Sequence, residues 1–130
     1  MTACLDSSAY IAMIRGNRSV ADSLSRFGEI IVPAAVVAEL TEGFYAARDP
    51  GAQSLALGRF IDRENVRFCP ATYAVAARYG FLSRQLRLKG TPLPVNDVWI
   101  AATALEEGAF AIVSYDRHFD EFGLIPRIAP

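Results

Sequence analysis

Four carboxylates lie beside strongly apolar segments of this 130-residue sequence. Asp6 follows the apolar run at residues 3–5, Glu39 lies in AAVVAEL, Asp97 lies in NDVWIAATAL, and Asp116 comes shortly after FAIVS. Carboxylates crowded into a cleft of low dielectric constant repel one another, and a divalent cation relieves that repulsion. Mg²⁺ and Mn²⁺ prefer oxygen ligands and can align a water molecule for attack on a phosphodiester. The four acids therefore predict a metal site with phosphodiester chemistry.

Each acid also has an ordinary structural explanation. Asp6 and Asp97 stand where helices are expected to begin, and aspartate is favoured there because it accepts hydrogen bonds from free backbone N–H groups. Glu39 has Glu42 one turn further along, as on a solvated helix face, and Asp116 lies in the turn-like stretch SYDRHF. A shared metal site accounts for all four acids at once, whereas the ordinary explanations require four separate coincidences.

Short apolar runs predict the strands that would position these acids. They lie at residues 3–5, 29–32, 66–69 and 110–114, and a last strand is expected at 125–128. Helical patterns lie between them, at residues 7–15, 20–27, 34–48, 53–63, 72–88 and 117–122, with a further helix from Asn96. This alternation predicts an α/β domain with a mostly parallel sheet. Ligands bind such folds at the carboxyl ends of the strands, where Asp6 and Asp116 are expected.

The helix that starts near Asn96 is apolar nearly all round, which predicts that it is buried. Asn96 is the expected N-cap, which leaves Asp97 in the first turn. Trp99 lies inside this helix and is expected to pack in the core, because a platform for base stacking must be open to solvent. Further upstream, Asp49-Pro50-Gly51 indicates a turn.

Length and composition fit one domain spanning residues 1–130. Apolar residues make up 52% of the chain, enough for a core without a disulfide or a structural metal. Cys4 and Cys69 form no CxxC pair, so we expect buried thiols in a reducing cytoplasm, although one bridge between them stays open. The N-terminal segment lacks a basic leader, and no apolar run approaches the ~18 residues of a membrane span. These features predict a cytoplasmic protein without membrane contact.

His118 is the only histidine, so a metal site within one chain cannot contain several imidazoles. Oxygen ligands must dominate such a site, which again favours Mg²⁺ or Mn²⁺. His118 could act as a general base beside Asp116, but a lone histidine after a turn is more often solvated or structural, and we favour that interpretation. The net charge of −1 does not exclude a nucleic-acid partner, because bound metal would neutralise several of the 14 acidic residues.

Four segments together resemble a known family. In chain order, LDSSAYIAMIRG, VPAAVVAELTEG, LPVNDVWIAATALEEG and AIVSYDRHFDEF resemble the conserved blocks of PIN-domain ribonucleases. The resemblance covers essentially the whole chain and is closest to the VapC-type toxins of bacterial and archaeal toxin–antitoxin pairs. It implies a three-layer α/β/α sandwich, endonuclease activity on RNA that depends on Mg²⁺ or Mn²⁺, a homodimer, and inhibition by a small cognate antitoxin of the VapB type.

The resemblance also assigns the site residues. The acidic site that it implies consists of Asp6, Glu39, Asp97 and Asp116. Ser114 stands where the family has a threonine or serine before the last acid, and its hydroxyl could hold a water molecule. The family often has Thr-Asn after the first acid, whereas this chain has Ser7-Ser8, so a substrate contact from Ser8 is in doubt. Asp120 is an alternative to Asp116 because the last acidic position varies across the family.

Two surface features have an open interpretation. A basic rim for RNA phosphates could be formed by Arg15, Arg18, Arg84, Arg87 and Lys89, although a solvated face explains the same residues. Phe44 and Tyr45 add apolar area near a helix end and could line a dimer interface or an antitoxin groove.

Three other functions compete with the nuclease. Aspartyl-phosphate phosphatases and receiver domains need a lysine in the site, and Lys89 is the only lysine. Phosphatases of this kind also carry a second acid two residues after the first, where this chain has Ser8. A catalytically inactive PIN-fold module that binds RNA or protein is the stronger alternative. Such a module would be expected to have lost some of the acids, whereas all four positions are acidic here.

Overall fold

The computed structural model describes residues 1–130 and is built around a five-stranded sheet. Its strands are β1 (Thr2–Leu5), β2 (Glu29–Pro33), β3 (Val66–Cys69), β4 (Ala111–Val113) and β5 (Arg127–Ile128). All neighbouring strands are parallel, in the order β3-β2-β1-β4-β5. The prediction of a mostly parallel sheet is therefore confirmed, and the last strand is shorter than expected.

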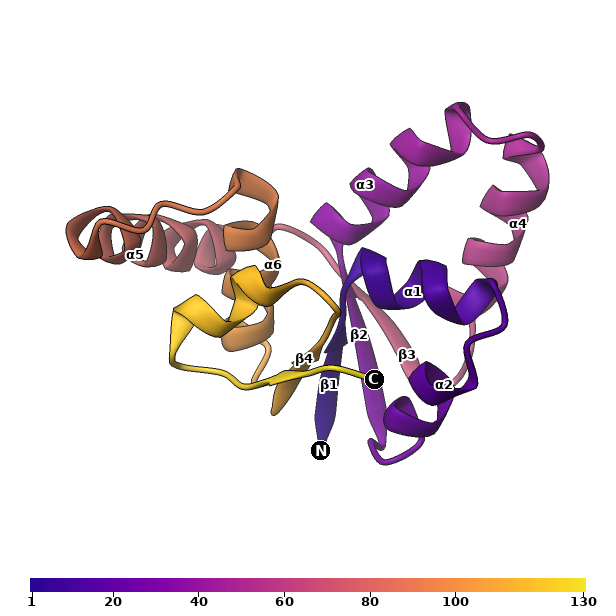
Figure 1. Cartoon of the computed structure of the whole chain (residues 1–130), viewed down its shortest axis with the longest axis horizontal. Helices are drawn as coiled ribbons and strands as arrows, with labels where there is room; N and C mark the ends of the chain where they lie inside the picture. The colour runs from indigo at the N-terminus through magenta and orange to yellow at the C-terminus, as the bar shows by residue number, and fades with distance from the viewer.

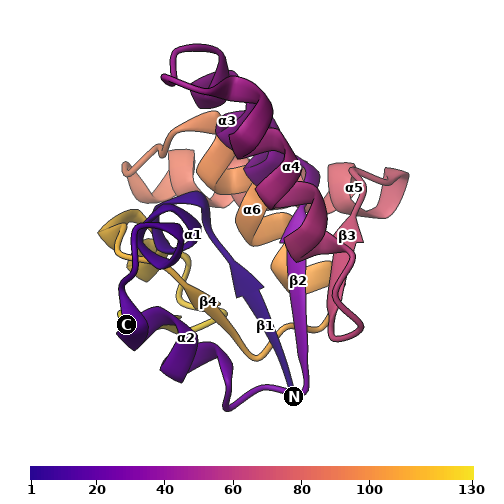
Figure 2. The same ribbon diagram turned by 90° about the vertical axis from the view of Figure 1, so that its right-hand side faces the viewer.

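Helices cover both faces of this sheet. They are α1 (Ser7–Ile14), α2 (Arg18–Leu24), α3 (Ala34–Tyr45), α4 (Pro50–Ile61), α5 (Tyr73–Lys89), α6 (Val95–Glu106) and the 3₁₀ helix η1 (Arg117–Phe122). The chain crosses the sheet in one direction from β1 to β3 and returns in the other to β4 and β5. Right-handed crossovers therefore put the helices of these two halves on opposite faces. Figures 1 and 2 show α5 and α6 on one face and α1, α2 and α4 on the other. This is the expected three-layer α/β/α sandwich.

The central strand β1 and its neighbour β4 are buried on both faces, as parallel strands covered by helices usually are. Residues 3–5 of β1 and 111–113 of β4 are all buried, and their apolar side chains form the middle of the core. Cys4 and Cys69 are both buried and free. None of the helices is both long and apolar enough to cross a membrane.

Two helix starts differ from the sequence prediction. Asp49-Pro50 begins α4 instead of forming a turn, because the Asp49 carboxylate accepts a hydrogen bond from the backbone N–H of Ala52 (3.1 Å) and Pro50 occupies the first turn. The expectation that Asn96 caps α6 is wrong. That helix begins at Val95, its N-cap is Pro94, and no side chain caps it. Asp97 does lie in the first turn, as predicted, but its carboxylate makes no capping hydrogen bond.

The carboxyl ends of β1 and β4 meet at the point where the strand order reverses. Leu5 pairs with Val113, and the backbone N–H of Asp6 donates to the Val113 carbonyl (3.1 Å). Helix α1 leaves β1 toward one face, while η1, after β4, packs against α6 on the other. The ends of the two strands therefore lie at the topological switch point of the sheet, between the layers, and this region, named the crevice, is the usual ligand position in open parallel sheets.

Candidate metal centre

Asp6 occupies the N-cap position of α1, but its carboxylate does not cap the helix. Its backbone is extended and its side chain accepts no hydrogen bond from the helix N–H groups. Its Oδ2 instead accepts hydrogen bonds from the hydroxyls of Ser114 (2.6 Å) and Ser8 (2.9 Å). Asp6 is only 4% exposed. A buried carboxylate oriented by two hydroxyls points to a site, not to the ordinary helix cap.

The same two serines fix the turn that follows β4. Ser114 is fully buried, and its hydroxyl accepts a hydrogen bond from the backbone N–H of Asp116 (2.9 Å). The Ser8 hydroxyl accepts one from the backbone N–H of Tyr115 (3.2 Å) and lies 3.2 Å from the Ser114 hydroxyl. Both serines therefore connect the end of β4 to Asp6 and to the start of α1. This geometry supports a positioning role for Ser8 and Ser114.

Asp97 reaches the crevice from the opposite layer. It is 8% exposed, and six of the following residues of α6, Val98 and those at 100–104, are buried as the apolar pattern predicts. Burial raises the pKa of Asp97, and its hydrogen bond with His118 works in the other direction. The charges of Asp116 and Asp6 raise the pKa further, because like charges disfavour ionisation. The three aspartates are thus close enough to affect one another.

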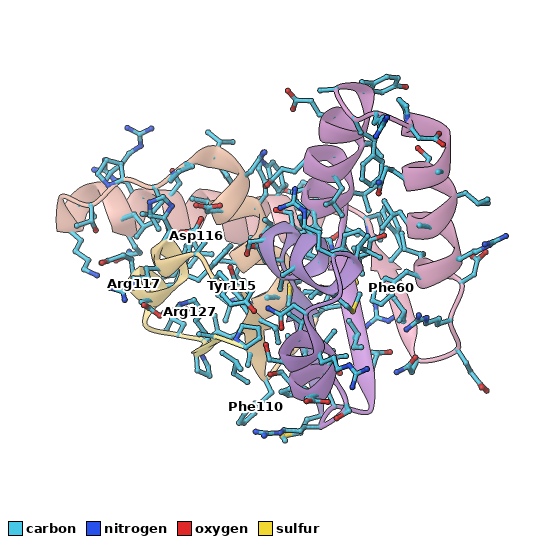
Figure 3. The ribbon with its side chains drawn as sticks, turned by 45° about the vertical axis from the view of Figure 1, so that its right-hand side comes forward. Phe60, Phe110, Tyr115, Asp116, Arg117 and Arg127 are labelled. Carbon is cyan, nitrogen blue, oxygen red and sulfur yellow. The ribbon has the colours of Figure 1, made fainter.

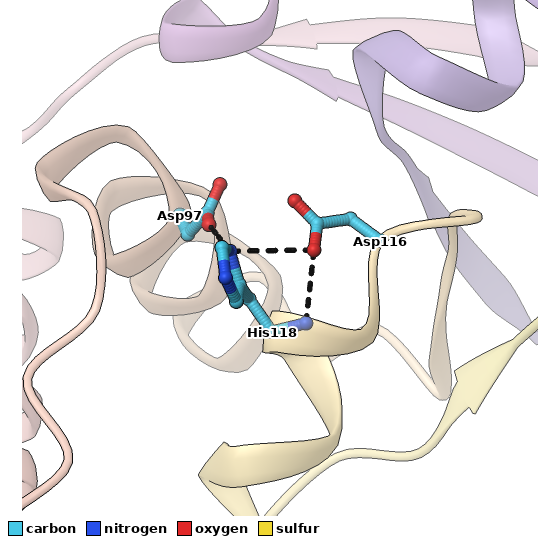
Figure 4. A group of neighbouring side chains, drawn as sticks. All are labelled: Asp97, Asp116 and His118. Atoms are coloured by element: carbon cyan, nitrogen blue, oxygen red, sulfur yellow. Dashed lines mark hydrogen bonds and ion pairs between the residues drawn. The ribbon is translucent and has the colours of Figure 1, made fainter.

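Asp116 and His118 complete this part of the crevice from the turn after β4. Asp116 is the N-cap of η1, and its Oδ1 accepts a hydrogen bond from the backbone N–H of His118 (2.9 Å). The His118 Nδ1 lies 2.8 Å from Oδ2 of Asp97 and 3.3 Å from Oδ1 of Asp116 (Figure 4). The sequence favoured a solvated or structural histidine, and the structure places His118 half-exposed with its Nδ1 between two predicted site residues.

Glu39 borders the same crevice from α3. The Ser7 hydroxyl donates to its Oε2 (2.9 Å), whereas its Oε1 is buried without a hydrogen-bond partner. Burial raises the pKa of Glu39, the Ser7 hydroxyl lowers it, the charges of Asp6 and Asp97 raise it, and the side-chain amide of Asn96 lowers it. An orphaned buried carboxylate oxygen beside two other acids is the arrangement that a bound cation would relieve. The contribution of Ser7 was not predicted from the sequence.

The spacing of these ligand atoms fits a divalent cation. One atom from each of Asp97, Asp116 and His118 lies within 4.8 Å of the corresponding atoms of the other two. Adjacent ligands of an octahedral ion with bonds of about 2.1 Å are about 3 Å apart. The distances from His118 Nδ1 to the two carboxylates, 2.8 and 3.3 Å, bracket that value. Asp6 and Glu39 adjoin this group, with oxygen atoms of the kind that Mg²⁺ and Mn²⁺ prefer.

The sequence profile of the PIN domain matches residues 3–124, nearly the whole chain. The chain belongs to the PIN domain family. No curated protein sequence matches it at a significant level.

Solved structures extend the comparison of this PIN domain. A chain of the VapBC2 complex from Rickettsia felis, bound to a DNA fragment from its promoter, has 21% identity and a TM-score of 0.84, with 98% of each chain covered. A chain of VapBC-5 from Mycobacterium tuberculosis has 25% identity and a TM-score of 0.72, again with 98% of each covered. VapC20 from the same organism, described as a toxin that cleaves the sarcin–ricin loop, has 16% identity and a TM-score of 0.74, covering 98% of this chain and 99% of its own. The fold is therefore similar to that of VapC toxins.

Asp120, the alternative last acid of the PIN domain, is engaged elsewhere. Both of its carboxylate oxygens accept hydrogen bonds from the guanidinium of Arg127 (2.9 and 3.0 Å). Arg127 also donates to the carbonyl of Ser114 (3.1 Å) and thereby ties β5 to the turn that carries Asp116. Figure 3 shows Arg127 near Tyr115, Asp116 and Arg117. The geometry favours Asp116 over Asp120 for the site.

The predicted basic rim is divided between two parts of the PIN domain. Arg84, Arg87 and Lys89 belong to α5, whereas Arg15 and Arg18 lie at the end of α1 and the start of α2, across the sheet (Figure 1). Lys89 forms an ion pair with Glu121 (3.2 Å). The five residues therefore do not form one continuous rim.

The two aromatic residues near the end of α3 also differ from each other. Phe44 is buried and lines a cavity of about 320 Å³ between α1 and α3, whereas Tyr45 is strongly exposed and lies outside it. Apolar side chains of both helices, among them Ile11, Ile14 and Leu40, line this cavity, and Glu39 lies on its wall. Trp99 packs partly buried against Tyr79, with ring centroids 4.6 Å apart, as expected for a core residue.

Proposed function

We propose that this PIN domain, residues 1–130, is a metal-dependent endoribonuclease and the toxin of a VapBC-type toxin–antitoxin pair that acts in the cytoplasm. One observation carries the proposal: the carboxylates of the residue after β1, of α3, of α6 and of the turn after β4 lie close enough to affect one another, and Glu39 has a buried and unpartnered oxygen. Similarity to the fold of a toxin described as cleaving the sarcin–ricin loop supports RNA as the substrate class.

In this proposal Asp6, Glu39, Asp97 and Asp116 hold Mg²⁺ or Mn²⁺. A divalent ion held by these residues would supply charge neutralisation at the phosphodiester and activation of water, so the protein would need no covalent nucleophile. The residues of the chain supply the geometry. Asp97 is held on a buried helix with little freedom to move, and the hydroxyls of Ser8 and Ser114 fix the rotamer of Asp6 at 2.9 and 2.6 Å.

We infer that an antitoxin of the VapB type occupies the cavity between α1 and α3. The cavity is lined mainly by apolar residues and reaches the acidic site through Glu39, which contributes to both. An apolar segment of the antitoxin seated there would cover the crevice and exclude RNA, which explains inhibition without a change of fold. A homodimer is the expected assembly of the toxin.

The test is cleavage of total cellular RNA by purified protein with Mg²⁺ or Mn²⁺ and then with a chelator. Asp97→Asn keeps the side-chain shape and removes the charge, and we expect it to lower the rate by about 100-fold or more. Asp22→Asn, on the exposed face of α2, is the matched control and should cut normally. Discrete cuts that need both metal and Asp97 would support the nuclease, whereas equal cutting by Asp97→Asn would refute the assigned site.

A catalytically inactive PIN-fold module that binds RNA or protein is the alternative. It predicts no metal-dependent cutting of any RNA, even where calorimetry shows that the protein binds metal and RNA. Two features favour the nuclease. All four acidic positions are filled, and Glu39 has an unpartnered carboxylate oxygen for which a binding module has no need.

A further inference from the structure

One nitrogen atom lies among the oxygen atoms of the acidic site. The Nδ1 atom of His118 is 2.8 Å from Asp97 and 3.3 Å from Asp116 (Figure 4). It has at most one hydrogen, so it cannot donate a well-directed hydrogen bond to both carboxylates. Asp97 is its hydrogen-bond partner, so the Asp116 carboxylate lies beside the same nitrogen without a directed hydrogen bond from it.

The surrounding structure holds the imidazole in this position. Residue 118 stands at the start of η1, where its backbone N–H is bound by Asp116. Phe119 and Phe122, three residues apart, are both buried and pack with ring centroids 6.2 Å apart, because residues at this spacing share one face of a 3₁₀ helix. Burial of that face fixes the rotation of η1 about its axis. The histidine is thereby directed toward α6 and Asp97.

We propose that Nδ1 of His118 is a direct ligand of the metal, together with Asp97 and Asp116, and that this nitrogen makes the site favour Mn²⁺ over Mg²⁺. The inference rests on the proposed function, since it concerns the metal that the nuclease uses. Both ions favour oxygen ligands, but Mg²⁺ is the harder ion and gives up its water reluctantly, whereas Mn²⁺, a first-row transition metal, accepts an imidazole nitrogen more readily than Mg²⁺ does. A neutral imidazole can bind metal through either nitrogen, and Nδ1 is the one that faces the carboxylates.

The single histidine of the chain allows a spectroscopic test of metal binding by imidazole. His118 is the only histidine, so any imidazole signal from protein-bound Mn²⁺ can come from this residue alone, provided that no histidine tag remains. Pulsed electron paramagnetic resonance of the full chain loaded with Mn²⁺ should show nitrogen modulation from imidazole. The modulation should disappear in His118→Gln. Arg117→Gln, an exposed position on the same 3₁₀ helix, should retain it.

Calorimetric titration with each ion gives the second measurement. We expect His118→Gln to weaken Mn²⁺ binding by about 10-fold or more and Mg²⁺ binding by less than about 3-fold, because only the first ion gains from nitrogen. The side chain of residue 118 is half-exposed, so we expect His118→Gln to fold, and circular dichroism checks this.

The outcomes separate this inference from the proposed function. Bound Mn²⁺ without nitrogen modulation, or equal weakening of both ions in His118→Gln, would overturn the role of His118 and leave the acidic nuclease site in place. No binding of either ion by the wild-type chain would remove the metal site itself, and the proposed function with it.

Discussion

The Ser114 hydroxyl lies 2.6 Å from Oδ2 of Asp6, and both residues are buried at the ends of neighbouring parallel strands. This hydrogen bond connects the first strand of the chain to the fourth at the point where the crevice opens. It also explains how a carboxylate that does not cap α1 is kept in a single orientation.

Ser114→Ala should therefore destabilise the protein and slow cleavage. The change leaves the backbone N–H of Asp116 without its acceptor and removes a donor from a buried carboxylate. We expect the free energy of unfolding in urea to fall by about 1.5–3 kcal/mol, the usual range for hydrogen bonds to charged groups. Ser54→Ala, at an exposed position on α4, should change it by less than about 0.5 kcal/mol. Equal stability of Ser114→Ala and wild type would show that this bond does not hold Asp6.

Glu39→Gln should make the metal-free protein more stable than the wild type, by a difference that grows as the pH rises. Burial raises the pKa of Glu39 above its ordinary value of 4.5, so the folded state takes up a proton more readily than the unfolded state. The stability that this group contributes is complete below pH 4.5 and is lost as the pH rises through the raised pKa. Unfolding of both proteins with chelator between pH 4 and pH 8 should show a difference that grows toward high pH.

The control for this pH series is Glu42→Gln, one turn further along α3. Its side chain is exposed, so replacing it removes a carboxylate from the same helix but from outside the crevice. We expect no gain in stability from this change. A gain from Glu39→Gln that is the same at pH 4 and pH 8 would contradict a buried charge at Glu39.

Metal binding should raise the melting temperature of the wild-type protein. An ion that binds only the folded state stabilises it by about 2.7 kcal/mol at 100 times its Kd, which corresponds to about 8 °C for a domain of this size. Calorimetric scans with and without Mn²⁺ measure the shift. Asp97→Asn should abolish most of it, since this carboxylate lies within ligand distance of two other donors. If Mn²⁺ left the melting temperature of the wild-type protein unchanged, that result would count against the metal site.

Ile14→Asp should prevent binding of the antitoxin. Ile14 is half-exposed at the cavity between α1 and α3, so the substitution places a charge in the apolar lining without opening the core. We expect the affinity for the cognate VapB-type antitoxin to fall by about 10-fold or more in a titration. Leu55→Asp, on the exposed side of α4 and outside this cavity, should bind normally. Equal affinities of the two variants would place the antitoxin elsewhere.

Much of the site follows from local sequence patterns, because Asp6 comes directly and Asp116 shortly after apolar runs that are typical of buried strands. Asp97 follows from the apolar helix that it begins. The direction of the His118 side chain could not be predicted from the sequence, for a physical reason. Its direction depends on how η1 rotates when Phe119 and Phe122 become buried, and spacing along the chain does not reveal that rotation.

Tertiary contacts account for the remaining differences. The hydrogen bond from Ser7 to Glu39 joins residues 32 positions apart, and no local pattern indicates it. The start of α4 could have been predicted, since Asp49-Pro50 is a good helix beginning as well as a turn signal. The choice of Asp116 over Asp120 depends on Arg127, which reaches Asp120 only when the last strand joins the sheet.

The pairing of β1 with β4 has a consequence for the synthesis of the protein. Asp6 leaves the ribosome well before its partner Ser114, which follows 108 positions later. A nascent chain therefore has no assembled site until Ser114 has been made, and a product that ends before Ser114 lacks one of the two hydroxyls that orient Asp6. Any activity that depends on this site therefore begins only after β4 has been made and has joined β1 in the sheet.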